Sequence, residues 1–160
     1  MEKNELEKLK DIAVKVRKGI LNAVYNGKSG HPGGSLSVAD ILTVLYFKEM
    51  NIDPKNPKMQ DRDRLVLSKG HCSPALYSVL ANRGFFGVEE LKTFRNLNSR
   101  LQGHPDMKNI PGVDMTTGSL GQGLSVSNGM AIAMKLDNLN SRVYCIMGDG
   151  EIEEGQVWEA

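Results

Sequence analysis

Apolar and polar residues follow two different spacings along the chain. Between residues 4 and 26, apolar side chains recur every three or four positions, which predicts an amphipathic helix whose Lys and Glu residues face solvent. The segments RLVLS at 64–68 and RVYCIM at 142–147 are instead short, continuous apolar runs. Such runs are typical of strands that are buried on both faces in a parallel sheet. The pattern therefore predicts one long surface helix and two buried strands.

Helical segments are predicted to separate and to follow these strands. The stretch SGHPGGS at 29–35 is rich in glycine and proline and is predicted to be non-helical. A helix is expected to start with Ser37 as its cap and Asp40 three residues later, and to continue through 41–47. Further helices are expected at 73–82, at 88–94 as a short turn, after TTGSLGQG up to about Asp137, and in EIEEGQVWEA. This alternation predicts an α/β fold with a partial parallel sheet flanked by helices, as a single domain over residues 1–160.

Small residues recur at every fourth position in the last of the long helical segments. These residues are Gly121, Ser125, Gly129 and Ala133. Residues four apart lie on the same face of a helix, one above the other. The pattern therefore predicts that another backbone can approach this face closely.

Composition and charge exclude several classes of partner. With 20 basic and 19 acidic residues the net charge is +1, which does not suit an electrostatic binder of nucleic acids or membrane surfaces. The start MEKNELEKLK is too charged for a signal peptide, and the longest apolar run, residues 41–47, is too short to span a bilayer. Cys72 and Cys145 form no CxxC pair, which favours a reducing, cytoplasmic compartment, although two distant cysteines can still form a disulfide.

The second apolar run ends on Gly148, Asp149 and Gly150. In open α/β sheets ligands lie beyond the carboxyl ends of the strands, and glycines let a phosphate approach backbone amides. Asp149 would repel a phosphate unless a cation bridges the two, and Mg²⁺ is typically held by one or two carboxylates together with phosphate oxygens. The alternative, which the residues support equally, is a tight turn followed by an acidic first helical turn.

Two other motifs fail at this position. A P-loop would need a lysine where Gln156 stands. An EF-hand loop that began at Asp149 would need glycine and glutamate where Glu154 and Ala160 stand. A diphosphate–metal site and a plain acidic helix start therefore stay the two interpretations of this segment.

Each of the three histidines follows a glycine at the boundary of a predicted element. They are His31 in SGHPGGS, His71 in SKGHCSP and His104 in QGHPD. An imidazole can move protons near neutral pH or donate a hydrogen bond to an alkoxide as it forms. Zinc binding is the competing use of three histidines, but no local cluster with ligand spacing is present. A single loop histidine is usually a solvated surface residue, so the hypothesis of a site depends on all three occurring together.

Taken together, these segments resemble the amino-terminal, diphosphate-binding section of transketolases. The resemblance covers nearly the whole chain, because SGHPGGSLSVADILTVLYF, DRDRLVLSKGHCSPALYSVL, GHPD, TTGSLGQGLSVSNGMAIA and GDGEIEEGQVWEA occur in the family's order. It implies the thiamin-diphosphate-binding fold and a thiamine-diphosphate-dependent transferase that moves a two-carbon ketol unit from a ketose phosphate to an aldose phosphate. It also implies Mg²⁺ or Ca²⁺ as the metal, a dimer, and a place in the pentose phosphate pathway.

The resemblance also assigns roles to residues. By the family's pattern Asp149 would bind the divalent metal and Gly150 the diphosphate. Beside the cofactor it would place His71 and the segment Gly118, Ser119 and Leu120. His31 and His104 would contact oxygens of the sugar substrate.

Two glutamates match positions at the family's dimer interface. Glu154 corresponds to a glutamate in the acidic link between the two cofactors of the dimer, and Glu159 lies near the same interface.

Parts of the family's site fall outside this sequence. A downstream asparagine completes the family's metal site, and a second domain holds the cofactor's pyrimidine ring with its activating glutamate. The resemblance therefore implies a diphosphate-binding domain that is incomplete at its carboxyl end, is inactive alone and needs a complementary carboxyl-terminal section in a homo- or hetero-oligomer.

Two other readings of the chain stay open. It could belong to another thiamine-diphosphate enzyme, such as 1-deoxyxylulose-5-phosphate synthase or a 2-oxoacid dehydrogenase component. It could also be a non-catalytic fragment that keeps only the family's dimer surface.

Overall fold

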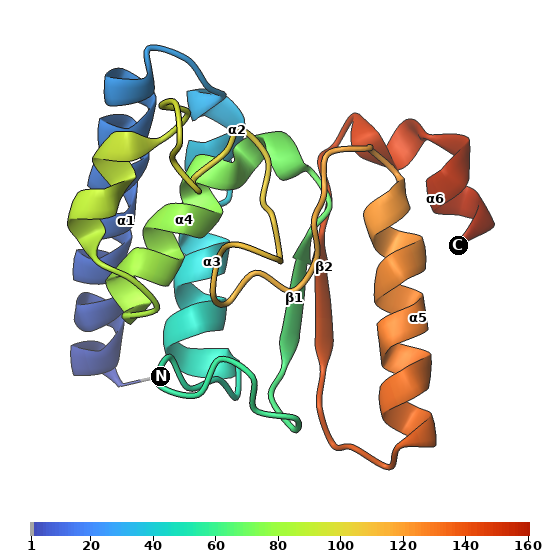
Figure 1. Cartoon of the computed structure of the whole chain (residues 1–160). Helices are drawn as coiled ribbons and strands as arrows, with labels where there is room; N and C mark the ends of the chain where they lie inside the picture. Colours follow the sequence, from blue (N-terminus) through green and yellow to red (C-terminus); the bar gives the residue numbers. More distant parts are fainter. Residues whose placement is uncertain (1) are drawn as a thin grey trace.

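Two short parallel strands, β1 (Arg64–Leu67) and β2 (Val143–Ile146), form the sheet in the computed structural model, which describes residues 2–160 (Figure 1). Arg64 pairs with Val143 and Leu67 pairs with Ile146, so both strands end at the same edge. The ladder continues past the strands, because the backbone N–H of Ser68 donates to the carbonyl of Ile146 at 2.8 Å. The two segments that follow the strands therefore start side by side.

Helices flank the sheet on both sides. On one side lie α1 (Lys3–Gly27), α3 (Ala39–Val44) and α4 (Ser73–Arg83), and on the other α5 (Gln122–Leu136) packs along β2 (Figure 1). The remaining segments are α2 (Pro32–Ser37), the π-helical turn η1 (Leu45–Glu49), the 3₁₀ turns η2 (Gly70–Cys72), η3 (Val88–Thr93) and η4 (Glu151–Glu153), and α6 (Gly155–Glu159). This is the predicted α/β fold. None of the helices in residues 2–160 is long and apolar enough to cross a membrane.

The hydrophobic core lies where α1, α3, α4 and β1 meet. α1 buries one stripe of its surface at the predicted spacing, namely Leu9, Ala13, Val16, Gly19, Ile20 and Ala23. α4 is buried from Ser73 to Ala81, and its Ser78 hydroxyl donates to the carbonyl of Val16 at 2.8 Å. β1 is buried from Leu65 to Leu67, whereas β2 is half-buried throughout. The expectation of two fully buried strands is thus correct for the first strand only, because Leu65 and Leu67 lie within the core whereas Tyr144 and Ile146 of β2 pack against its margin.

Most predicted elements agree with the structure within one or two residues. α1, β1, β2, α4, η3 and α5 are all present where the apolar spacing indicated. The last element differs, because the chain after the Gly-Asp-Gly turn forms a 3₁₀ turn at Glu151–Glu153 and breaks at Glu154, whose ψ is 132°. Only then does α6 begin. The extended backbone at Glu154 explains why EIEEGQVWEA is not one continuous helix.

The region around Pro32 is helical, contrary to the sequence prediction. α2 spans Pro32–Ser37 with the proline in its first turn, where the missing N–H costs nothing and the fixed φ suits a helix. Ser37 is therefore the last residue of α2 and not a helix cap, and its hydroxyl donates to the carbonyl of Gly34 at 2.9 Å. α3 follows Val38 without a side-chain cap. As a consequence His31 stands immediately before the start of a helix.

The small-residue face predicted on α5 is approached at its start by α6, because a Cβ on Gly121 would lie 3.2 Å from Gln156 Cβ and the Gln156 side-chain amide donates to Ser125 Oγ at 3.1 Å. A second close approach, which the sequence did not predict, occurs at Gly123. A Cβ on Gly129 would meet no atom within 4 Å, whereas a Cβ on Gly123 would lie 2.2 Å from Ser68 Oγ and 2.8 Å from Ser68 Cα. The end of β1 therefore packs against the first turn of α5 at a position that admits only hydrogen.

We predict opposite stability effects for alanine at these two glycines of α5. Gly123→Ala should lower the free energy of unfolding by about 1–3 kcal/mol, because Ser68 backbone would have to move. Gly129→Ala, the matched control, should raise it by roughly 0.5–1 kcal/mol through helix propensity alone. Urea unfolding followed by circular dichroism measures both, and equal effects would contradict the packing at Gly123.

Candidate functional site

A cavity of about 280 Å³ opens at the carboxyl edge of the two strands. Its lining comes from four segments: α2, the turn after β1, the loop before α5, and the turn after β2. The lining residues are Gly34, Ser37, Lys69, His71, Leu120, Gly148, Asp149, Gly150 and Glu151. The parallel register explains this convergence, because both strands deliver their following residues to one place.

The structure brings the three histidines together. The ring centroids of His31 and His71 are 5.0 Å apart, with the rings in an edge-to-face arrangement. His104 packs on Gly118, where a Cβ would lie 3.0 Å from its Cδ2. His31 and His104 are also close enough to His71 to act electrostatically on it. The prediction that the Gly-His segments share one region is therefore consistent with the geometry.

The environment keeps two of these imidazoles neutral near pH 7. Burial lowers the pKa of His71, and the charges of His31, Lys69 and His104 lower it further. Burial also lowers the pKa of His104, with additional effects from Arg95 and His31. A neutral imidazole can accept a proton on one nitrogen and donate a hydrogen bond from the other.

The Gly-Asp-Gly turn faces the same cavity as His71. Asp149 and Gly150 are solvent-exposed and line it, and Leu120 closes it from the loop before α5. Gly118 and Ser119 line a neighbouring cavity of about 280 Å³ that runs along the first turn of α5.

The two glutamates assigned to the dimer interface lie away from this cavity. Glu154 and Glu159 are exposed and do not line it. Both positions are open to a partner, and their interface role stays a prediction.

Sequence reasoning missed Lys69, which lies in the wall of the cavity. Lys69 is only 8% exposed. Its ammonium donates to the carbonyl of Gly34 at 3.2 Å and to Ser37 Oγ at 3.3 Å. Within residues 2–160, no ion pair includes this ammonium. A buried cation that meets only neutral acceptors favours an anionic ligand. The signal in the sequence was its place, directly after a buried strand and within SKGH.

A second missed residue is Glu151, which is buried at 3% exposure beside the turn. In the sequence it reads as one of four glutamates that favour a helix start. In the structure its carboxylate accepts backbone hydrogen bonds from Gly121 and Gly148. It is therefore part of the framework of the site.

The residues of the cavity suit a diphosphate. They suit a metal ion only if the phosphate oxygens supply further ligands. Lys69 supplies a positive charge, and a Cβ on Gly150 would meet no atom within 4 Å, so the turn leaves room for a ligand near its amides. Asp149 offers one exposed carboxylate. No group of three or more metal-ligating side chains occurs in the described part of the chain. A divalent cation here would need phosphate oxygens as further ligands, as Mg²⁺ commonly does.

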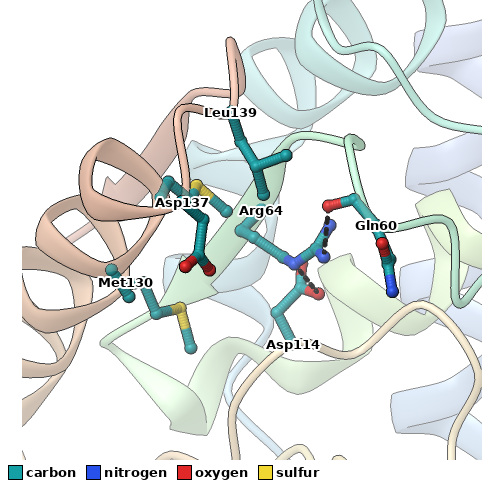
Figure 2. A pocket seen from close by; sticks show the side chains of 8 residues that line it. Gln60, Arg64, Asp114, Met130, Asp137 and Leu139 are labelled. Carbon is teal, nitrogen blue, oxygen red and sulfur yellow. Dashed lines mark hydrogen bonds and ion pairs between the residues drawn. The ribbon is translucent and has the colours of Figure 1, made fainter.

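A larger cavity, of about 520 Å³, lies at the opposite end of β1, between Arg64 and the carboxyl end of α5. Figure 2 shows Arg64 between Gln60 and Asp114, with its guanidinium engaged. That guanidinium donates to the carbonyls of Arg62 at 2.7 Å and of Gln60 at 3.2 Å, and Asp114 accepts from the N–H of Leu65 at 2.8 Å. Because these polar groups satisfy one another, the cavity reads as structural and not as the reactive site.

Comparison with known families identifies the family of the chain. The family model described as "Transketolase, thiamine diphosphate binding domain" matches residues 9–160. The chain belongs to the transketolase family. The resemblance of the motifs, and with it the α/β diphosphate-binding fold, is thereby confirmed.

Relatives within the transketolase family include proteins that are separate subunits by name. The chain is 52% identical to the 6-deoxy-6-sulfo-D-fructose transketolase subunit SqwG of Clostridium sp. (strain MSTE9), over 91% of this chain and 53% of the relative. It is 46% identical to one of the subunits of the apulose-4-phosphate transketolase of Phocaeicola vulgatus, over 98% of this chain and 55% of the relative. The chain thus spans about half the length of these curated relatives.

Solved transketolases share the fold at high similarity. The Campylobacter jejuni transketolase matches with a TM-score of 0.88 at 40% identity, over 94% of this chain and 25% of that chain. The transketolase of Leishmania mexicana matches with a TM-score of 0.87 at 34% identity, over 94% of this chain and 24% of that chain.

We predict that His71 titrates below the ordinary value of 6.5 and that Lys69→Met moves its pKa upward, because one neighbouring cation is removed. NMR titration of the imidazole signals measures both values. Since the unfolded histidine binds its proton first as pH falls through 6.5, the free energy of unfolding should decrease below that pH.

The control is Lys10→Met on the exposed surface of α1, which should leave the His71 titration unchanged. A His71 pKa at or above 6.5 in the wild type would contradict the packing described for the imidazole.

Proposed function

We propose that the chain is the diphosphate-binding section of a transketolase, which transfers a two-carbon ketol unit from a ketose phosphate to an aldose phosphate. One observation carries the proposal: His71, Lys69 and Asp149 line a single cavity at the carboxyl edge of the parallel strands. Such a site needs three kinds of group: one that transfers protons, as His71 can, a cation that binds anions, as Lys69 can, and a carboxylate that binds a metal cation, as Asp149 can. The family membership of residues 9–160 supports the same conclusion.

The diphosphate end of the cofactor is proposed to lie between Lys69 and the Gly-Asp-Gly turn. Lys69 supplies the charge, Gly150 leaves space beside the backbone, and Asp149 binds the Mg²⁺ (or Ca²⁺) that the phosphate oxygens share. Gly118, Ser119 and Leu120 are proposed to contact the cofactor from the loop before α5. The hydrogen bonds from the Lys69 ammonium to phosphate oxygens would be charge-assisted, and such bonds are about twice as strong as neutral ones.

The histidines are proposed to handle the oxygens of the sugar. When bound, thiamine diphosphate supplies the carbon nucleophile that carries the two-carbon unit. His71 lies beside the cofactor position, and His31 and His104 are proposed to donate hydrogen bonds to the hydroxyl and carbonyl oxygens of the substrate. Because burial keeps His71 and His104 neutral, each can pass a proton as charge develops on the oxygen that it contacts.

A complementary carboxyl-terminal section is proposed to complete the enzyme. The two curated relatives described above are subunits by name, and the chain spans about half of each. Exposed apolar residues on the last two helices, Ile132 on α5 and Trp158 on α6 at 81% exposure, offer surface for such a partner. Glu154 and Glu159 are proposed to lie in the interface of the resulting homo- or hetero-oligomer. The completed enzyme is proposed to act in the pentose phosphate pathway in the cytoplasm.

A second candidate differs only in the donor sugar. The 52% identity to the sulfofructose transketolase relative favours a donor that carries a sulfonate in place of the phosphate. Assays of the completed enzyme with xylulose 5-phosphate and with 6-deoxy-6-sulfofructose would separate the two by their kcat/KM values.

The proposal predicts that the chain alone has little or no transketolase activity and that a complementary section restores it. Asp149→Ala should weaken Mg²⁺-dependent binding of thiamine diphosphate more than about 100-fold, beyond the effect of groups that only support a metal ligand. Calorimetry of the assembled enzyme measures this affinity.

The matched control is Asp137→Ala at the far end of α5, which should bind normally, and both variants should keep the wild-type circular dichroism spectrum. Unchanged affinity in Asp149→Ala, or turnover by the chain alone, would contradict the proposal.

The Lys69→Met variant should bind thiamine diphosphate roughly 10–100-fold more weakly, which corresponds to the loss of one hydrogen bond to a charged group. Its affinity for thiamine, which has no phosphates, should stay within about twofold. Parallel calorimetric titrations with the two compounds test whether Lys69 acts on the diphosphate, and equal losses for both would show that it does not.

A further inference from the structure

We propose that Glu151 is a positioning residue that fixes the Gly-Asp-Gly turn against the end of β1 and the start of α5, and so sets the cofactor affinity of the site. This inference rests on the proposed function, because it concerns the same diphosphate site. It concerns a residue for which neither the sequence motifs nor the family resemblance gave a role.

The carboxylate of Glu151 joins three segments that are far apart in the sequence. Its Oε1 accepts a hydrogen bond from the hydroxyl of Ser68, just after β1, and one from the N–H of Gly121, just before α5, at 3.0 Å. Its Oε2 accepts from the N–H of Gly148 at 2.8 Å. One side chain therefore sets the relative positions of all three loops that close the cavity from the sheet side.

The burial of Glu151 makes these contacts obligatory. The residue is 3% exposed, and within residues 2–160 no ion pair includes its carboxylate. A buried carboxylate without a cation is tolerated when hydrogen bonds stabilise its charged form. The three donors serve that purpose, so the carboxylate and the loops depend on each other.

The same contacts distinguish Glu151 from a metal ligand. Both of its oxygens are occupied by donors of the protein, whereas Asp149, two residues earlier, is exposed to the cavity. The two carboxylates of the turn thus have separate tasks, one toward the ligand and one toward the framework.

Each hydrogen bond lies next to a residue that lines the cavity. The N–H of Gly148 precedes Asp149, and the N–H of Gly121 follows Leu120. Gly121 has φ +83°, a conformation that glycine adopts freely and L side chains rarely adopt, and Glu151 holds the amide of this residue in place. A shift of the carboxylate would therefore displace the proposed metal ligand and the opposite wall of the cavity together.

The test compares Glu151→Gln with Glu153→Gln in the enzyme assembled with its complementary section. Glutamine keeps the size of the side chain, but its NH₂ group cannot accept a hydrogen bond. At least one of the three donors would therefore lose its acceptor. We expect Glu151→Gln to bind thiamine diphosphate with Mg²⁺ about 10–100-fold more weakly, as for groups that orient metal ligands. Glu153, exposed in the same 3₁₀ turn, undergoes the same chemical change and should give wild-type affinity.

Two further measurements separate positioning from a general structural role. At saturating cofactor, Glu151→Gln should keep kcat and the KM for the ketose within about threefold, while the KM for thiamine diphosphate rises with the dissociation constant. In the chain without cofactor, the amides of Gly121 and Gly148 should exchange with deuterium at least about tenfold faster than in the wild type, because their acceptor is weakened.

Ser68→Ala supplies a second variant should Glu151→Gln fail to fold. It removes one of the three donors and leaves both amide contacts, so we expect a loss of affinity of roughly tenfold, the lower end of the range for one hydrogen bond to a charged group.

The outcomes distinguish this inference from the proposed function. Wild-type affinity in both Glu151→Gln and Ser68→Ala would overturn the positioning role alone. A loss of kcat at saturating cofactor with no change in the KM for cofactor would overturn it as well. If the wild-type assembly itself bound no thiamine diphosphate, the proposed function would fall, and the positioning role with it.

Discussion

The parallel pairing of β1 with β2 is the constraint on which the site depends. The backbone N–H groups of both Ser68 and Lys69 are directed at the carbonyl of Ile146, at 2.8 and 3.4 Å, so the pairing extends beyond the strands into the loops that carry the chemistry. Had the strands been antiparallel, the segments after them would emerge at opposite edges, and His71 could not share a cavity with Asp149. Gly123 adds to this constraint, because it lets the first turn of α5 lie directly on Ser68.

The charged groups around the cavity differ in the partners that stabilise their charge. The carboxylate of Glu151 is occupied by donors of the protein, while the ammonium of Lys69 meets only neutral oxygens and the carboxylate of Asp149 faces the cavity. In the described part of the chain, the two charged groups that line the cavity without such a set of donors or an ion-pair partner, Lys69 and Asp149, are the ones that suit a diphosphate and its metal. The neighbouring imidazoles, kept neutral by burial and by adjacent positive charge, add proton-transfer groups without adding to the charge.

The sequence predicted the elements whose energetics are local or periodic, and it missed those decided by tertiary contacts. The apolar stripe of α1 and the run of β1 were recognisable because burial on one stripe or on both faces imposes those spacings. α2 was missed because glycine disfavours helices, yet Pro32 fits a first helical turn. Glu151 and Lys69 were missed because both residue types usually lie on the surface. Only the positions of the other loops show that these two side chains are enclosed.

The separation of β1 and β2 in the sequence also has a consequence for how the molecule reaches its native state. The packing of α1 on α4 joins residues as distant in the chain as Val16 and Ser78, and the strand pairing joins Arg64 to Val143. Both contacts close long loops, and the entropic cost of closure grows only slowly with loop length. We therefore expect the helical layer and the strand pairing to form together in one cooperative step. Ligand affinity would then emerge only with the complete native fold, so that partly folded chains would have no means of sequestering cofactor.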